Sequence, residues 1–91
     1  MSIEEREWLA VVDEYIRIMA EPCPGSEVVI RRLIKLNHIR KWDIVRFMAL
    51  RMYPNALAEN NSHMGAITDI AVQLNTSERT IWSIINQVRA K

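Results

Sequence analysis

The sequence predicts an all-α fold, a compact bundle of about five helices that forms a single domain over residues 1–91. Glycine is scarce, with two in 91 residues, while 49% of the residues are hydrophobic and strong helix formers are abundant. Hydrophobic residues also recur three and four positions apart, which is the helical period, and only residues 27–30 resemble a strand. A chain of this length buries one modest core, so one domain is expected.

The first two helices are predicted from their caps and their hydrophobic periodicity. Ser2 and Glu5 fit a capping box, and the helix must end before Pro22 because proline restricts the residue that precedes it. Its expected inner residues are Trp8, Leu9, Val12, Tyr15, Ile16 and Met19. Ser26 is the predicted cap of the second helix. The second helix has an expected inner face of Val29, Ile30, Leu33, Ile34 and Leu36, and a basic outer face of Arg31, Arg32 and Lys35.

A third helix is expected after Asn37 and His38, ending at Pro54. It is hydrophobic over much of its circumference, which is typical of a central helix that neighbours contact from several sides. The residues responsible are Ile39, Trp42, Ile44, Val45, Phe47, Met48, Ala49 and Met52. A polar loop over residues 59–62 then leads to a fourth helix that starts near His63.

Residues 66–88 match the pattern of a helix-turn-helix motif. Ala71 lies where the two helices would cross most closely, a position that requires a small side chain. Asn75 takes the turn position usually held by glycine, since Asn tolerates a positive φ, and Ser77 is placed to cap the last helix. The residues expected to face inward are Ile70, Leu74, Ile81, Ile84, Ile85 and Val88.

This register predicts which side chains of the last helix face outward and read bases in the major groove of double-stranded DNA. They are Glu78, Arg79, Trp82, Ser83 and Asn86. Arg79 suits guanine and Asn86 suits adenine, while Glu78 either accepts from cytosine or favours the positive end of the helix. Trp82 either packs on a thymine methyl or sugar, or anchors the helix against the third helix, and the anchoring role is slightly favoured.

The charge distribution indicates where phosphates would bind. Residues 1–27 carry a net charge of −5, residues 28–53 carry +6, and residues 54–91 are neutral. Phosphate contacts are therefore expected mainly from the basic middle of the chain and from hydroxyls at the start of the last helix. The predicted phosphate-binding residues are Arg40, Lys41, Arg46, Arg51, Thr76, Ser77 and Thr80. Equally, the acidic and basic segments could simply complement each other or be solvated faces.

Residues 43–54 (DIVRFMALRMYP) and 67–88 (ITDIAVQLNTSERTIWSIINQV) resemble the layout of the DNA-binding domain of bacterial replication initiators and the related Trp-repressor-like group. The resemblance covers about half of the chain. It implies that a long helix precedes the helix-turn-helix and presents an arginine to DNA, and Arg46 falls at that position. Initiators carry a Gly-Gly-Arg-Asp-His-type turn where this chain has Leu-Asn-Thr-Ser-Glu-Arg, so initiator function is not implied.

The expected function is that of a sequence-specific DNA-binding transcriptional regulator. Such proteins usually bind as dimers, so a homodimer is expected. The acidic first helix with Trp8 and Tyr15 is the expected dimer or protein-partner surface, and the alternative is that these two aromatic side chains fill the core. The alternative is a protein–protein interaction module or adaptor on the same scaffold, without DNA binding, which Glu78 on the reading face favours.

Other classes of function are not expected. The sequence has no phosphate loop or nucleophile elbow, and His38 and His63 lack a carboxylate or cysteine at metal-ligand spacing, so each is predicted to be a loop or surface residue. We therefore expect no enzyme, no metal and no cofactor. One cysteine, no hydrophobic leader and no hydrophobic run near the length of a membrane span predict a soluble cytoplasmic protein with no membrane partner.

Overall fold

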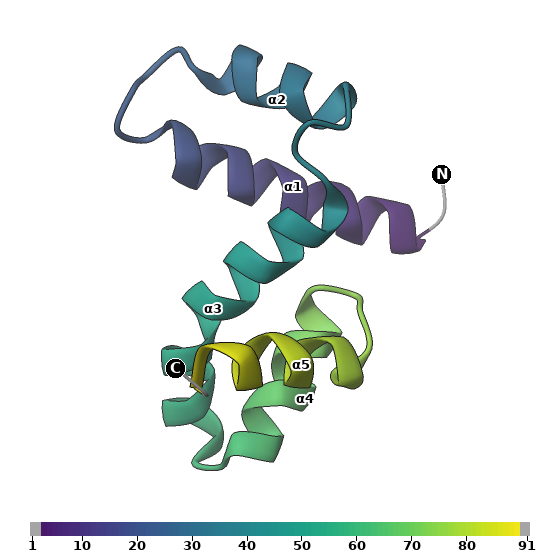
Figure 1. Ribbon diagram of the computed structural model, residues 1–91, viewed down its shortest axis with the longest axis vertical. Coiled ribbons are helices and arrows are strands. Elements are labelled where there is room, and N and C mark those ends of the chain that lie inside the picture. The colour runs from purple at the N-terminus through teal and green to yellow at the C-terminus, as the bar shows by residue number, and fades with distance from the viewer. Residues whose placement is uncertain (1–2, 90–91) are drawn as a thin grey trace. The chain divides into compact units, whose positions relative to one another are not determined.

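The computed structural model describes residues 3–89, and within that range it contains five α-helices and no strand (Figure 1). The helices are α1 (Ile3–Ala20), α2 (Glu27–Lys35), α3 (Lys41–Asn60), α4 (His63–Gln73) and α5 (Glu78–Arg89). The predicted all-α fold with five helices is confirmed. The capping box predicted at Ser2 lies outside the described residues.

The chain divides into two compact units, an N-terminal unit of Met1–Ile44 and a C-terminal unit of Val45–Lys91. The boundary falls within α3, which contributes its first residues to one unit and the remainder to the other. The single domain predicted from the sequence stays a prediction.

In the N-terminal unit, α1 and α2 pack side by side and run in opposite directions (Figure 1). α1 ends at Ala20, before Pro22, as predicted. Ser26 takes the N-cap position of α2, but its side chain makes no capping hydrogen bond, so the cap predicted from the sequence is wrong. Its backbone is helical rather than extended (φ −76°, ψ −7°). The Glu27 carboxylate instead accepts a 2.9 Å hydrogen bond from the N–H of Gly25, whose φ is +96°.

Burial in this unit follows the predicted periodicity only in part. Val12, Tyr15 and Ile16 of α1 are buried as predicted, whereas Leu9 and Met19 are exposed. Burial of Tyr15 makes it a core residue, so its expected place on a dimer or partner surface is wrong. α2 contains no buried residue: its predicted inner residues Ile30, Leu33 and Ile34 are half-buried, and Val29 and Leu36 are exposed. Its basic side chains Arg31, Arg32 and Lys35 are exposed, as predicted. A salt bridge of 3.1 Å between Arg31 and Asp13 links α2 to α1.

The predicted end of the third helix at Pro54 is wrong, because α3 continues through Pro54 to Asn60. Proline removes one intrahelical hydrogen bond, but the following turn contains Ala56 and Ala58, which favour helix, and Ala56 is buried. The final turn is also tied to α4. Asn60 Nδ2 donates to the carbonyl of Ala56 at 2.8 Å and to Asp69 Oδ2 at 3.3 Å. Both hydrogen bonds stabilise the last turn of α3.

The C-terminal unit comprises the rest of α3 together with α4 and α5. α4 begins at an extended Ser62, whose hydroxyl accepts a 3.0 Å hydrogen bond from the N–H of Gly65. The predicted loop over residues 59–62 is therefore shorter, since α3 includes Asn60 and the turn consists of Asn61 and Ser62. The unit has a core of small and branched side chains. The buried residues include Val45, Met48, Ala49, Ala56, Ala66, Ile67, Ile70, Ala71, Leu74, Ile81, Ile84 and Ile85. Within the described part of the chain, no helix is long and hydrophobic enough to cross a membrane.

Candidate nucleic-acid interface

The turn between α4 and α5 has the backbone geometry that the sequence predicts. α4 ends at Gln73, and Asn75 adopts a φ of +51°, in the left-handed region that Asn tolerates. The N–H of Asn75 donates to the carbonyl of Val72 at 3.2 Å, and that of Thr76 donates to the carbonyl of Ala71 at 3.0 Å. These two bonds close the C-terminal end of α4 and reverse the chain without a glycine.

The contact between α4 and α5 is made by the residues that the sequence predicts, with one exception. Ala71, expected at the close approach of the two helices, is only 4% exposed. The predicted inward residues Ile70, Leu74, Ile81, Ile84 and Ile85 are all buried. Val88 was expected to join them, but it is 44% exposed, so this prediction is wrong. It lies in the last turn of α5, one turn beyond Ile85, where the buried stripe of the helix has ended.

Burial of one stripe of α5 leaves the opposite side of its first turns in solvent. Glu78, Arg79 and Ser83 are exposed, and Trp82 is 41% exposed. Asn86 is half-buried, so its amide has less access to a ligand than the sequence predicts. We call Glu78, Arg79, Trp82, Ser83 and Asn86 the outer face of α5. All five predicted base-reading residues therefore lie on one helix, with the first four at its N-terminal end.

The cap of α5 is built from two hydroxyl groups. Ser77 Oγ accepts a 3.2 Å hydrogen bond from the N–H of Thr80, as the predicted cap requires. The hydroxyls of Ser77 and Thr80 also share a 2.8 Å hydrogen bond, in which one donates to the other. One hydroxyl hydrogen of the pair thus remains available for a phosphate oxygen, not two. Thr76, the third hydroxyl predicted at this end of the helix, is half-buried.

A cluster of three ring side chains, Tyr53, His63 and Trp82, connects three helices of this unit. The Tyr53 hydroxyl of α3 and Nδ1 of His63 share a 2.7 Å hydrogen bond. The rings of His63 and Trp82 meet edge to face, with centroids 4.9 Å apart. Trp82 therefore has a structural contact with His63 of α4. Its expected anchoring against the third helix stays a prediction.

The position of His63 is the main feature that the sequence analysis missed. His63 was predicted to be a loop or surface residue, yet it is the first residue of α4 and is half-buried, whereas His38 is exposed as predicted. Its partners lie 10 residues before it and on the next helix, so no local periodicity marks the contact. The one available signal was the position of His63 immediately after a good N-cap, Ser62.

The predicted phosphate-binding basic residues fall into two groups. Arg46 and Arg51 are exposed on the part of α3 that belongs to the C-terminal unit. Arg40 and Lys41 belong to the N-terminal unit, where each has a local contact. The N–H of Arg40 donates to Asp43 Oδ2 at 2.9 Å, and Lys41 Nζ lies 4.8 Å from the centroid of the Trp8 ring. The Lys41–Trp8 contact is a cation–π interaction that occupies one side of the ammonium group.

In the part of the chain that the structure describes, no three His, Cys, Asp or Glu side chains come together as a candidate metal site. The outer face of α5 offers an arginine, a carboxylate, a hydroxyl and an indole at the positive end of a helix dipole, and the amide of Asn86 nearer the C-terminal end. No protein-family model, curated protein or solved structure matches the chain. The geometry of α4, α5 and their turn is therefore the basis for any functional assignment.

Proposed function

We propose that the protein is a sequence-specific double-stranded DNA-binding protein, acting as a transcriptional regulator, that reads the major groove with the outer face of α5. The observation that carries the proposal is the exposure of Arg79 and Ser83 at the N-terminal end of a helix whose opposite stripe is fully buried. In helix-turn-helix proteins, residues at this end of the second helix contact base edges.

The side chains on this face suit the bases. The planar guanidinium of Arg79 can donate two parallel hydrogen bonds to O6 and N7 of guanine. Ser83 is short and serves as donor or acceptor toward several bases. Trp82 is partly exposed on this face and contacts the His63 ring, and we expect that contact to restrict the indole. Such restricted side chains lose less entropy when they bind.

Phosphate binding would come from the same unit. The sequence of the C-terminal unit, Val45–Lys91, contains five basic and three acidic side chains, a net charge of +2. Arg46 and Arg51 on α3, together with the backbone N–H groups at the start of α5, are the phosphate ligands that we propose. The charge is modest, so we expect few phosphate contacts and a moderate dependence of affinity on salt.

The proposal is tested by selection of bound sequences from random duplex DNA, followed by gel-shift titration of the selected duplex at low and moderate salt. We expect an enriched sequence and an affinity that falls as salt rises. Failure to enrich any sequence, together with the absence of a salt-sensitive shift, would refute DNA binding.

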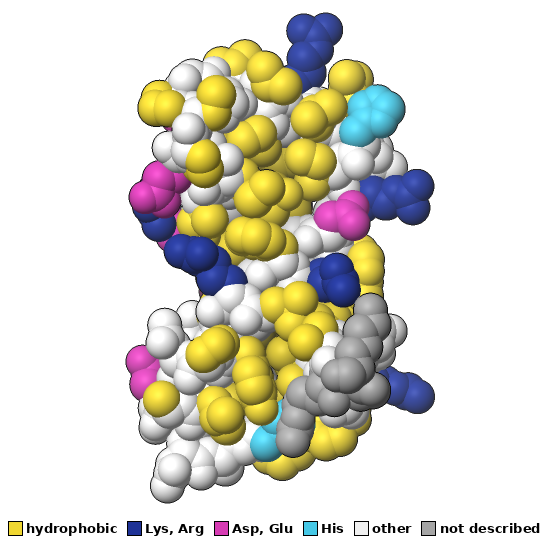
Figure 2. All heavy atoms as spheres, turned by 60° about the vertical axis from the view of Figure 1, so that its left-hand side comes forward, with side chains coloured by type: hydrophobic (Ala, Val, Ile, Leu, Met, Phe, Trp, Pro, Cys, Tyr) yellow, Lys and Arg dark blue, Asp and Glu magenta, His cyan; other side chains and the backbone are white. Residues whose placement is uncertain are grey.

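The second candidate is a protein-interaction module. It is favoured by hydrophobic side chains that remain in solvent on α4, where Val72 is 73% exposed and Met64 is 57% exposed, and by the acidic Glu78 on the outer face of α5. Figure 2 shows that hydrophobic side chains reach the surface beside basic ones. Exposed hydrophobic groups of this kind can mark contacts with a protein. Substitution of Val72 and Met64 by Ser leaves DNA affinity unchanged if the primary proposal is correct.

A further inference from the structure

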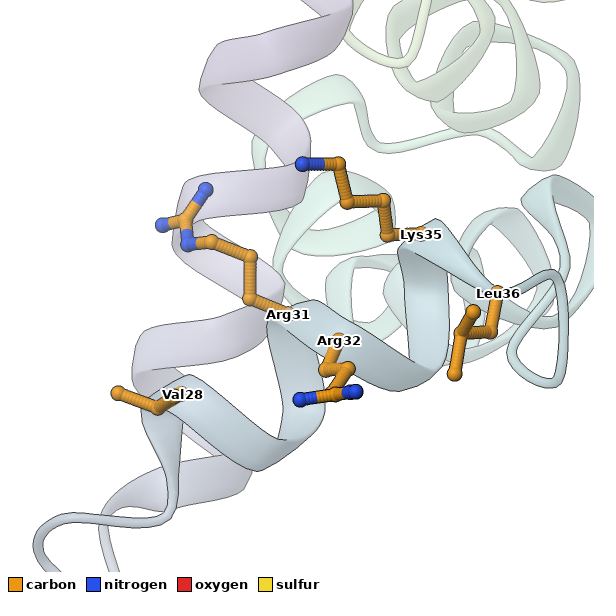
Figure 3. A pocket seen from close by; sticks show the side chains of 5 residues that line it. All are labelled: Val28, Arg31, Arg32, Lys35 and Leu36. Carbon is orange, nitrogen blue, oxygen red and sulfur yellow. The ribbon is translucent and has the colours of Figure 1, made fainter.

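The outward side of α2 forms a surface with its own chemical character. We call Val28, Arg31, Arg32, Lys35 and Leu36 the α2 face. These residues line an open depression of about 460 Å³ (Figure 3). The first four belong to α2, and Leu36 is its C-cap residue. Val28 is 76% exposed and Leu36 is 58% exposed, so two hydrophobic side chains stand in solvent among three cations.

The three cations of the α2 face are not equivalent. Arg31 is paired with Asp13 of the same chain at 3.1 Å, and both side chains are largely exposed. Among the described residues the structure gives neither Arg32 nor Lys35 a salt bridge. The α2 face thus offers two uncompensated positive charges beside exposed hydrophobic surface, which is the composition that complements an acidic segment of a protein.

The same unit carries acidic groups that its own α2 does not cover. Glu4 and Glu7 are exposed in the first turns of α1. α1 has 18 residues and α2 has 9, so at 1.5 Å per residue α2 extends along only about half of α1. The two helices run in opposite directions, and the Asp13–Arg31 pair fixes their register, which places Lys35 level with about residue 9 of α1. Glu4 and Glu7 therefore lie beyond the end of α2.

We infer that the α2 face binds the acidic first turns of α1 from a second copy of this chain, so that the protein forms a symmetric dimer through its N-terminal unit. In a two-fold dimer each copy supplies both surfaces, and the contact between Glu4 and Glu7 of one copy and Arg32 and Lys35 of the other is made twice. Val28 and Leu36 leave water in the same step, which adds a hydrophobic contribution to the charge pairing.

Nucleic acid fits the α2 face less well than a second copy does. The N-terminal unit, Met1–Ile44, contains eight acidic and seven basic side chains, and this net charge of −1 gives no general attraction for a polyanion. The two exposed hydrophobic side chains at the ends of the face, Val28 and Leu36, also have no role in binding phosphates (Figure 3). The inference goes beyond the proposed DNA binding and does not depend on it, since every residue involved belongs to the N-terminal unit.

The experiment measures molecular mass by analytical ultracentrifugation over a range of protein concentrations, without DNA. We expect wild type to dimerise, with a dissociation constant that increases with salt because the pairs are exposed. The double variant Arg32→Glu/Lys35→Glu and the double variant Glu4→Lys/Glu7→Lys should each weaken dimerisation by about tenfold or more. The charge-preserving variant Arg32→Lys/Lys35→Arg is the matched control and should dimerise as wild type does.

A mixture of the two charge-reversed variants provides the decisive measurement. Their surfaces are complementary to each other, so the mixture should form a heterodimer, detected by native mass spectrometry. Circular dichroism of each variant confirms that the substituted helices remain folded. A monomeric wild type at every concentration, or a dimer unaffected by both reversals, would overturn the inference. So would a loss of DNA affinity in Arg32→Glu/Lys35→Glu with unchanged mass, since that result would make nucleic acid the occupant.

Discussion

The rings of Trp82 and His63 meet edge to face, with their planes at 67° and their centroids 4.9 Å apart. This contact joins the outer face of α5 to the first residue of α4. Because His63 also bonds to Tyr53 of α3, the contact ties a predicted base-reading residue to the packing of the whole C-terminal unit. Trp82 thus has a structural role even though part of its ring is in solvent.

The first prediction concerns the energy of this contact. Replacement of Trp82 by Ala should lower the free energy of unfolding by about 1–2 kcal/mol, less than for a fully buried tryptophan. A double-mutant cycle of Trp82→Ala and His63→Ala, measured by urea unfolding, should give a coupling energy of about 0.5–1.5 kcal/mol. Additive effects of the two substitutions would show that the rings do not stabilise each other.

The second prediction separates base reading from phosphate binding. Arg79→Ala should weaken binding to the selected DNA sequence by about 1–3 kcal/mol of binding free energy. It should also relax the base preference at one base pair. Arg46→Ala should weaken binding to all sequences alike and reduce the slope of log affinity against log salt by about 1. Competition gel shifts against single-base variants make the comparison. Equal behaviour of the two variants would refute the orientation proposed for α5. Arg46 is a better test of phosphate binding than Lys41, because Lys41 already makes a cation–π contact with Trp8.

The third prediction concerns the turn. Asn75 has a φ of +51°, in the left-handed region. Alanine has a Cβ there without the polar side chain that lets Asn tolerate this backbone, so Asn75→Ala should lower the free energy of unfolding by about 1 kcal/mol. Asn75→Gly should change stability by less than about 0.5 kcal/mol, because glycine adopts this backbone without strain. Asn55→Ala, on the exposed surface of α3, is the control and should be neutral or slightly stabilising. Chemical denaturation of the three variants distinguishes the turn from a general effect of losing Asn.

The fourth prediction concerns the cap of α5. Ser77→Ala removes the acceptor for the N–H of Thr80 and should lower stability by about 1 kcal/mol. Ser77→Asp should retain most of the stability, since a carboxylate also caps a helix. Ser83→Ala lies on the same helix without a capping role and serves as the control in thermal unfolding. If the Ser77 and Ser83 variants melt together, the cap contributes nothing.

The fifth prediction concerns alkaline pH. Burial of Tyr15, and then the negative charge of Asp43, raise the pKa of its phenol above the ordinary value. As pH rises, the phenol therefore loses its proton in the unfolded chain before it does so in the folded protein. The contribution of Tyr15 to the free energy of unfolding is fully present below about pH 10 and decreases above it. Urea unfolding between neutral pH and the alkaline range should show this decrease. Tyr15→Phe should flatten it, and an unchanged slope in Tyr15→Phe would contradict the assignment.

Much of the local structure could be predicted because it depends on neighbours within one helical turn. The C-terminal ends of α1 and α4, the positive φ of Asn75 and the cap at Ser77 each follow from the chemistry of a few adjacent residues. Pro54 and Ser26 mark the limit of such reasoning. Proline is a strong local signal, but burial of Ala56 and the bonds from Asn60 outweigh it, and the helical backbone of Ser26 removes its capping geometry.

By itself the sequence determined the all-α class, the inward stripe of α5 from Ile81 to Ile85 and, through that stripe, the outward position of Arg79. Only the tertiary structure decided which contacts Trp82 makes on the outer face of α5 and where the buried stripe ends. Trp82 is held by His63 from another helix, and Val88 is left in solvent where packing ends. The physical reason is that helical period fixes which side chains share a face, whereas the contacts of that face depend on elements distant in the chain.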